Sequence, residues 1–98
     1  MTKIKTSELQ GAALDWAVAE ATGEQWSHHS TDWRQGGRLV EYFKVGLAPD
    51  AGGVWWAVVF AGGVATSHER GPTPLIAACR AIVAAKLGDE ADVLEGLV

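Results

Sequence analysis

Apolar positions recur every three or four residues over residues 6–22, the first long patterned segment of the chain. This spacing is typical of a helix that packs along one wide face. Thr6 or Ser7 can cap its start, and Ser7 and Gln10 have the spacing of a capping box. Gly23 is a good C-terminal stop. The pattern therefore predicts a helix from about residue 6 to residue 22.

A second segment, residues 75–87, is apolar almost throughout. Thr73 is suited to cap a helix here, and Pro74 is suited to its first helical position. Gly88 is expected to end the helix. Because the segment carries so few charges, we expect this helix to be mostly buried.

A less regular region lies between these segments and fits two interpretations. The sequence Ser30-Thr31-Asp32 is typical of a helix cap, and apolar residues follow it at helical spacing. The pair Gly36-Gly37 weakens a helix but lets another backbone approach closely. The residues of 38–47 favour a strand instead. We predict a helix over about 32–42, followed by a strand over 43–47.

Residues 54–61 give the clearest strand, because β-branched and aromatic residues dominate them. Gly62-Gly63 suits a two-residue hairpin turn, after which residues 64–69 return beside the strand. The turn fixes a register with the pairs Ala61–Val64, Phe60–Ala65 and Val59–Thr66. Both faces of the 54–61 strand are apolar, so we expect both to be covered.

These elements predict an α+β fold in the order α-α-β-β-β-α. We expect a small antiparallel β-meander of about three strands with helices packed on both faces, since a two-stranded hairpin alone is marginal. Residues 1–5 fit either a frayed end or an edge strand through Ile4. Residues 89–98 fit a loop or a short edge strand at Val93. The 98 residues fit a single domain, 1–98.

Charge and composition exclude several classes of protein. The net charge is −4 and the eight Lys and Arg form no block, so we expect no duplex nucleic acid as a partner. The single cysteine allows no internal disulfide and no thiolate metal cluster. The chain shows neither a signal peptide nor an apolar stretch long enough to cross a bilayer. We expect a cytoplasmic protein with no cofactor, no metal and no membrane contact.

Candidate catalytic and metal-binding groups are few. His28, His29 and His68 lack the spacing of a zinc site, and we expect the loop histidines to lie at the surface. Ser30 lacks the surroundings of a hydrolase nucleophile, so its segment is interpreted as a helix cap. Cys79 lies in the apolar last helix and is expected to be a core residue.

Four residues remain as candidates for binding a ligand or partner: Asp32, Trp33, Arg80 and Trp26. Arg80 is a charge inside a nearly all-apolar helix, so it must reach solvent, a carboxylate or an anionic ligand. The carboxylates considered for it are those of Asp15, Asp32 and Glu41.

Tryptophan is frequent, with five residues in 98. Trp26 and Trp33 can stack on a base or anchor a partner protein. Trp55 and Trp56 are expected to point to opposite faces of their strand, so they form no common platform. We expect two or three of the five to lie in the core, which leaves the others for an interface.

Three groups of residues carry a family resemblance. They are Lys5 to Leu9 with Gly11 to Ala19, Ser30 to Trp33 with Gln35-Gly36-Gly37 and Glu41, and Gly71, Thr73 to Ala78, Arg80 and Lys86 to Glu90. Together they resemble the NinX-like phage proteins, small proteins of tailed-phage genomes. The second group is also similar to a related phage domain described as an α-β-α sandwich. Family members often have Pro, Met and Pro where this chain has Arg38, Cys79 and Leu94.

The resemblance implies a phage or prophage origin and expression inside an infected bacterium, but no particular activity. With surplus aromatic residues and no catalytic set, we expect a non-enzymatic accessory protein that binds a host or phage protein, as a homodimer. The alternative is a protein that binds or sequesters an anionic nucleotide. In that case Arg80 supplies charge, Asp32 supplies hydrogen bonds and Trp33 supplies a stacking face.

Overall fold

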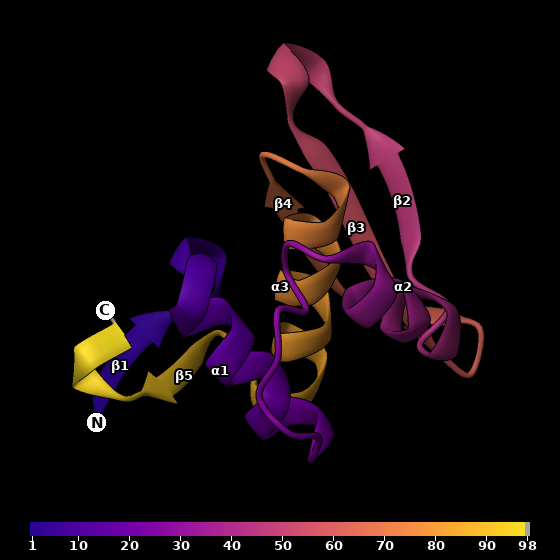
Figure 1. Ribbon diagram of the computed structural model, residues 1–98. Helices are drawn as coiled ribbons and strands as arrows, with labels where there is room; N and C mark the ends of the chain where they lie inside the picture. The colour runs from indigo at the N-terminus through magenta and orange to yellow at the C-terminus, as the bar shows by residue number, and fades with distance from the viewer. Residues whose placement is uncertain (98) are drawn as a thin grey trace.

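A single helix, α3 (Pro74–Leu87), lies at the centre of the computed structural model, which describes residues 1–97. α1 (Gly11–Thr22) and α2 (Trp33–Tyr42) pack beside it, and a three-stranded sheet packs against it (Figure 1). Thr73 caps α3 by accepting a hydrogen bond from the Ile76 N–H. The predicted capping and the predicted start of this helix are therefore confirmed.

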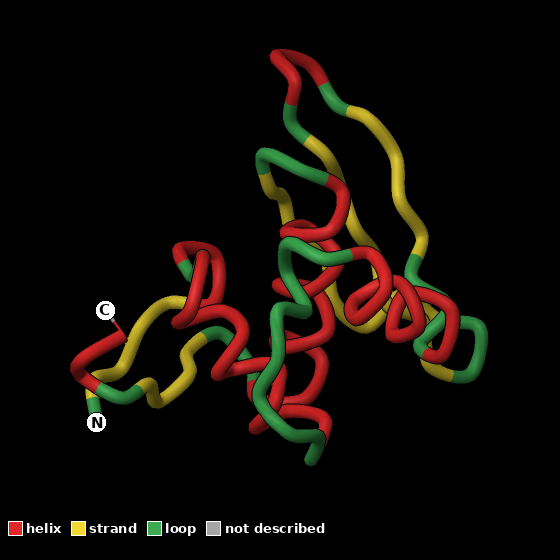
Figure 2. The backbone as a smooth tube through the Cα atoms, viewed as in Figure 1, coloured by secondary structure: helices red, strands yellow, loops and turns green. Residues whose placement is uncertain are grey.

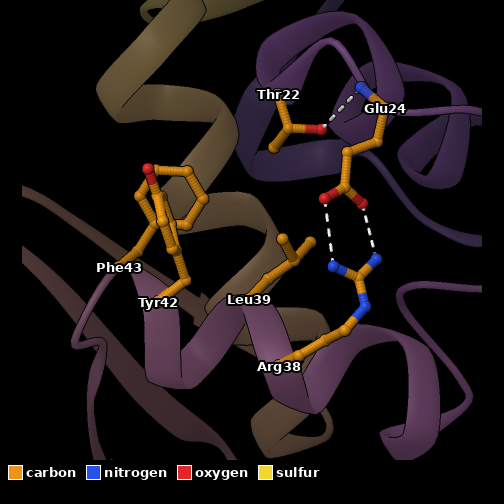
Figure 3. A pocket seen from close by; sticks show the side chains of 6 residues that line it. All are labelled: Thr22, Glu24, Arg38, Leu39, Tyr42 and Phe43. Atoms are coloured by element: carbon orange, nitrogen blue, oxygen red, sulfur yellow. Dashed lines mark hydrogen bonds and ion pairs between the residues drawn. The ribbon is translucent and has the colours of Figure 1, made fainter.

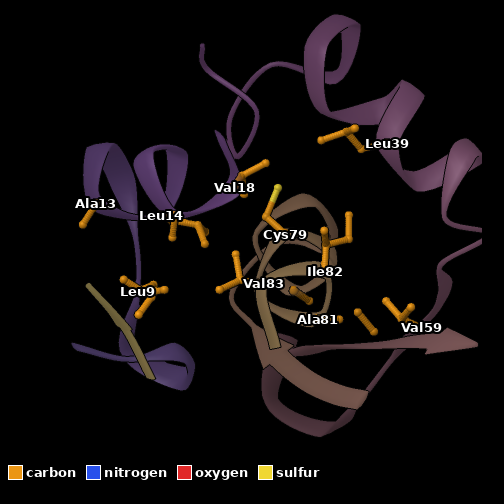
Figure 4. Close-up of a cluster of buried hydrophobic side chains, with 14 of the residues drawn as sticks. Leu9, Ala13, Leu14, Val18, Leu39, Val59, Cys79, Ala81, Ile82 and Val83 are labelled. Atoms are coloured by element: carbon orange, nitrogen blue, oxygen red, sulfur yellow. The ribbon is translucent and has the colours of Figure 1, made fainter. Parts of the chain in front are cut away.

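The buried apolar side chains form one cluster around α3. Ile82 and Val83 project from α3, and Leu14 of α1, Leu39 of α2 and Val59 of the sheet approach it from different sides (Figure 4). Burying each large apolar side chain stabilises the fold by roughly 1.5–3 kcal/mol. The burial of the last helix, predicted from its lack of charges, is confirmed.

The larger sheet contains β2 (Gly46–Pro49), β3 (Trp55–Ala61) and β4 (Val64–Gly71), with β3 in the middle and both pairs antiparallel (Figure 2). A short 3-10 turn, η2 (Ala51–Gly53), joins β2 to β3. Gly62 and Gly63 both have positive φ, as a primed hairpin turn requires. The α+β class and the three-stranded antiparallel sheet are thus confirmed.

A second, two-stranded sheet joins the two ends of the described chain. β1 (Thr2–Lys5) pairs antiparallel with β5 (Glu90–Val93), and Ile4 lies opposite Ala91. The short turn η3 (Glu95–Leu97) follows β5. Of the alternatives open for the two ends, the strands are the ones observed, and the full order becomes β-α-α-β-β-β-α-β.

The predicted start of the first helix is wrong. Residues Thr6–Glu8 form a separate 3-10 turn, η1, and α1 begins only at Gly11. The Thr6 hydroxyl donates to the Gly88 carbonyl (2.7 Å), so it closes the end of α3 and does not cap α1. The capping box does not form, since Gln10 at the N-cap makes no side-chain bond. The predicted end at Gly23, in the left-handed conformation, is confirmed.

The ambiguous middle region divides close to the predicted place. Asp32 caps α2 by accepting from the Arg34 N–H (2.9 Å), which confirms the helix. The strand predicted over 43–47 is observed over Gly46–Pro49. The shift arises because Phe43 still closes α2 and Lys44 adopts a positive φ of 52°, so this part of the chain turns before it extends.

The predicted hairpin register is correct for two pairs and wrong for the third. Ala61 pairs with Val64 and Phe60 with Ala65, but Val59 pairs with Ser67 because of a β-bulge. Thr66 is the extra residue, and its hydroxyl donates to the Val59 carbonyl (3.1 Å). A bulge of this kind leaves one residue unpaired and strengthens the local twist.

Helices cover only one face of the three-stranded sheet, so the prediction that they cover both is corrected. Ala57 and Val59 are buried on the face that packs on α3, while α1 and α2 are used to surround α3 itself. The other face, here called the open face, carries partly buried or exposed side chains from all three strands. Its residues are Ala48, Trp56, Val58, Phe60, Ala65, His68 and Arg70.

Candidate functional site

A cleft of about 440 Å³ lies between the end of α1 and the last turn of α2. It is lined by Thr22, Glu24, Arg38, Leu39, Tyr42 and Phe43 (Figure 3). The guanidinium of Arg38 donates two hydrogen bonds to the Glu24 carboxylate, of 2.6 and 3.0 Å. Opposite this pair, the rings of Tyr42 and Phe43 meet edge to face, with centroids 5.0 Å apart.

The charges of Arg38 and Glu24 cancel within this cleft. The hydrogen bonds from Arg38 hold the pKa of Glu24 below the ordinary carboxyl value, so the pair stays ionised near neutral pH. Lys86 adds a cation 5.5 Å from the centre of the Phe43 ring. Because both groups of the ion pair are already engaged, the cleft suits an apolar side chain better than a charged ligand.

Glu24 also reaches a buried histidine in the loop that precedes α2. His29 is fully buried, so its predicted place at the surface is wrong. Its Nε2 lies 3.3 Å from the Glu24 carboxylate and 3.0 Å from the Ser27 hydroxyl. The Ser27 hydroxyl also lies 3.2 Å from Nδ1, so it faces the ring edge between the two nitrogens, whereas in a catalytic triad the nucleophile bonds to one ring nitrogen and the acid to the other. The arrangement therefore stabilises the loop and does not activate Ser27.

The same loop is tied to α1 through a buried carboxylate. Asp15 accepts a hydrogen bond from the Ser30 N–H (2.8 Å) and lies 4.0 Å from Nδ1 of His28. Asp32, two residues after Ser30, is the helix cap that the Ser-Thr-Asp segment predicted. The Ser30 hydroxyl is buried without a hydrogen-bond partner within residues 1–97.

Cys79 occupies the core position that the sequence predicted. Its thiol is buried and lies 3.5 Å from the His29 carbonyl oxygen, to which it donates. Desolvation, with the negative charge of Asp15 as a smaller cause, raises its pKa to about 12. A thiol of this kind is a poor nucleophile at neutral pH.

We therefore expect the native protein to react with a disulfide-exchange reagent such as DTNB at pH 8 only through unfolding. Because the thiolate fraction is small and the sulfur is buried, the native reaction is expected to be at least about a hundredfold slower than in 6 M guanidinium chloride. Release of thionitrobenzoate is the measurement. Similar rates in both conditions would contradict the buried position.

The four residues predicted to bind a ligand lie in different settings. Asp32 is occupied as a cap, and Trp33 follows it at the start of α2 with half of its surface exposed. Trp26 is 47% exposed on the preceding loop, where its ring meets the edge of His28 with centroids 5.0 Å apart. Trp26 and Trp33 are thus accessible aromatic side chains, while Asp32 has a structural role.

Arg80 is occupied by the backbone. Its Nε donates to the Leu9 carbonyl (2.7 Å), and one terminal nitrogen donates to the Arg70 carbonyl (2.9 Å). The prediction of a partner among Asp15, Asp32 and Glu41 is wrong. Desolvation lowers the pKa of Arg80, and the nearby charge of Glu69 opposes this shift. Arg80 therefore links the start of α1 to the outermost strand of the sheet.

Comparison with known proteins gives a family match for the middle of the chain. Residues 25–86 match a family model described as Bacteriophage P22, NinX. The chain belongs to the NinX family. No curated protein matches the chain. The resemblance drawn from the sequence is thus confirmed, and the NinX match includes α2, the three-stranded sheet, and α3 up to Lys86.

Some features described above lie inside the NinX match, and others lie outside it. The open face, Arg38 and Cys79 lie inside the matched region, while α1 and the small β1–β5 sheet lie outside it. The pairing of Arg38 with Glu24 was missed at the sequence level, because 14 residues separate the two and no periodicity links them. Only the fold of the loop brings them together.

Among residues 1–97, no three His, Cys, Asp or Glu side chains are grouped so that they could hold a metal ion. In the same part of the NinX-family chain, every helix is too short or too polar to cross a bilayer.

Proposed function

We propose that this NinX-family phage protein is a non-enzymatic accessory protein that works by binding other protein chains, and that its open face binds a second copy of itself. The observation that carries the proposal is an apolar sheet face left without a helix. The three helices lie elsewhere, so a second molecule is the source of cover that we propose for Trp56, Val58 and Phe60.

Two aromatic side chains of the open face are held in place by their neighbours. Phe60 is 48% exposed, and its ring lies over Gly46 on the neighbouring strand, where a Cβ would meet it at 3.5 Å. The guanidinium of Arg70 stacks on the Trp56 ring, 4.4 Å from its centre, and pairs with Asp50 (3.2 Å). A preorganised aromatic surface loses little conformational entropy on association, which favours a protein partner.

Charge favours a second copy as the occupant. The outer strand β4 presents His68 and Arg70, while the other edge of the sheet presents Ala48 and ends at Asp50. A two-fold axis parallel to β3 places β4 of one copy opposite β2 of the other. Arg70 of each copy then faces the Asp50 end of its partner's β2, so the pair made within one chain can be exchanged for an equivalent pair between copies, in an aligned packing of two sheets.

The size of the face sets the expected strength. The strands are spaced about 4.8 Å apart, and the central strand β3 is seven residues long while β2 has only four, so the open face covers at most about 24 by 14 Å. This is small for a stable interface, so we expect a dissociation constant on the order of 10–100 µM. The dimer is therefore expected to be observable at high concentration and largely dissociated when dilute.

Replacing Phe60 with glutamate is expected to abolish dimer formation, because the buried carboxylate would face an apolar partner. The half-exposed position makes the change tolerable in the monomer. The matched control is Tyr42→Glu, an aromatic residue that is 77% exposed on α2 and outside the open face. Sedimentation equilibrium from 5 to 500 µM would contradict the proposal if both variants, or neither, behaved differently from the parent protein.

We place the action of the protein in the cytoplasm of the infected bacterium, with a host or phage protein as a further partner, because the family is a phage family. The alternative, binding of an anionic nucleotide, was motivated by Arg80. It has less support, since that guanidinium donates to two backbone carbonyls.

A further inference from the structure

We propose that the hollow between Trp16 and Trp26 binds the cationic end of a lysine or arginine side chain on a partner protein. The hollow has a volume of about 320 Å³ and lies at the end of α1, away from the three-stranded sheet. It is lined by Trp16, Ala19, Glu20, Gly23, Glu24 and Trp26. The site is thus separate from the open face.

Both indole walls of this hollow are held in place. Nε1 of Trp16 donates to the Asp92 carbonyl (3.2 Å), which fixes its ring against β5. The ring of Trp26 is supported by the edge contact with His28. Tryptophan attracts cations over its face more strongly than the other aromatic side chains do. Two fixed indoles in one hollow therefore favour an ammonium or guanidinium group.

The electrostatics of the hollow point to the same class of ligand. Ala19, Glu20 and Gly23 belong to the last turn of α1 and its cap, where the helix dipole is negative. Glu20 is exposed, and no Lys or Arg within residues 1–97 lies at ion-pairing distance from it. Glu24 is already bound by Arg38. Glu20 is therefore the carboxylate available to an incoming cation.

The shape favours a protein segment over a free small cation. A second hollow of about 270 Å³ adjoins the first and shares Glu20 with it. It is lined by Lys3, Glu20, Leu87, Glu90, Ala91 and Asp92. Lys3 is paired with Asp92 (3.4 Å), which leaves Glu20 and Glu90 as its other charged groups. Because the two hollows share Glu20, a basic segment that lies along α1 and β5 can contact Glu20 and Glu90 together.

The test uses the full chain labelled with ¹⁵N, in which the five indole N–H signals report on each tryptophan separately. The probes are a peptide with two lysines separated by one glycine, the matching peptide with two glutamates, and spermidine. We expect the lysine peptide to shift the Trp16 and Trp26 signals saturably, with little effect on those of Trp33, Trp55 and Trp56. Added salt is expected to weaken the binding.

Variants make the assignment specific. Trp26→Ala and Glu20→Gln are each expected to weaken binding of the lysine peptide about fivefold or more, the effect of about 1 kcal/mol per cation contact. Trp33→Ala is the matched control, since Trp33 and Trp26 are exposed to nearly the same extent, 50% and 47%. It is expected to leave the affinity unchanged.

Three results would overturn the proposal. The first is an absence of saturable shifts at Trp16 and Trp26 with the lysine peptide. The second is equal binding of the glutamate peptide, or equal weakening by Trp33→Ala. The third is tight binding of spermidine without binding of the peptide, which would assign the hollow to a free polyamine. Dimer formation through the open face is measured separately, so the two ideas fail independently.

Discussion

Replacing Gly36 with alanine is expected to lower the free energy of unfolding by about 2–3 kcal/mol, net of the helix-propensity gain. A Cβ at this position would overlap the backbone carbonyl oxygen of His29 and lie 2.8 Å from a methyl group of Leu75. Neither neighbour can move easily, because His29 and Leu75 are both buried. The His29 carbonyl also accepts a hydrogen bond from Cys79. The midpoint of thermal unfolding is expected to fall by roughly 10–20 °C.

The adjacent glycine supplies the control. A Cβ on Gly37 would meet only a ring carbon of Trp33, at 3.2 Å, and this half-exposed side chain can move. Because alanine favours a helix interior, Gly37→Ala is expected to raise the free energy of unfolding by about 0.5–1 kcal/mol. Urea denaturation of both variants is the measurement. Equal effects at the two positions would contradict the close approach of α2 to the loop.

Replacing Arg80 with methionine is expected to cost about 2 kcal/mol of stability. The variant keeps an unbranched apolar stem and the helix propensity but removes both donors, so the carbonyls of Leu9 and Arg70 lose these hydrogen bonds. The loss is expected to be greatest where α1 begins, so hydrogen exchange of the amides near Leu9 should accelerate more than that of the α3 core.

An exposed arginine gives the comparison for this change. Arg34 pairs with Asp32 at 3.4 Å, and its side chain is 91% exposed, so Arg34→Met is expected to change stability by less than about 0.5 kcal/mol. Similar losses in both variants would show that Arg80 has no special role. An added nucleotide that raises the unfolding temperature of the parent protein, but not that of Arg80→Met, would instead support the nucleotide alternative.

Much of the fold follows from local physics, so the sequence could predict it. The cap at Asp32, the stop at Gly23 and the Gly62-Gly63 turn each need a particular backbone conformation or a side-chain acceptor. The lack of charge over residues 75–87 predicted the central buried helix. Of the glycine pair in α2, Gly36 provides the predicted close backbone approach and Gly37 does not.

The errors come from contacts between distant parts of the chain. Thr6 looked like a cap for α1, but its hydroxyl binds Gly88 at the end of α3. A strand with two apolar faces indicates that both need cover, but it does not show whether that cover comes from the same chain. The candidate site was hardest to predict, because carbonyl partners, such as those of Arg80, carry no sequence signal.

The most direct test of the central claim is a search for contacts between copies through the open face. In a sample that mixes labelled and unlabelled protein at about 500 µM, filtered NOE spectra detect only protons on different chains. If the copies associate through the open face, we expect intermolecular NOEs from the Phe60 ring and the Trp56 indole to residues of the partner's open face. Intermolecular NOEs confined to other surfaces, or none from these two rings, would contradict the central claim.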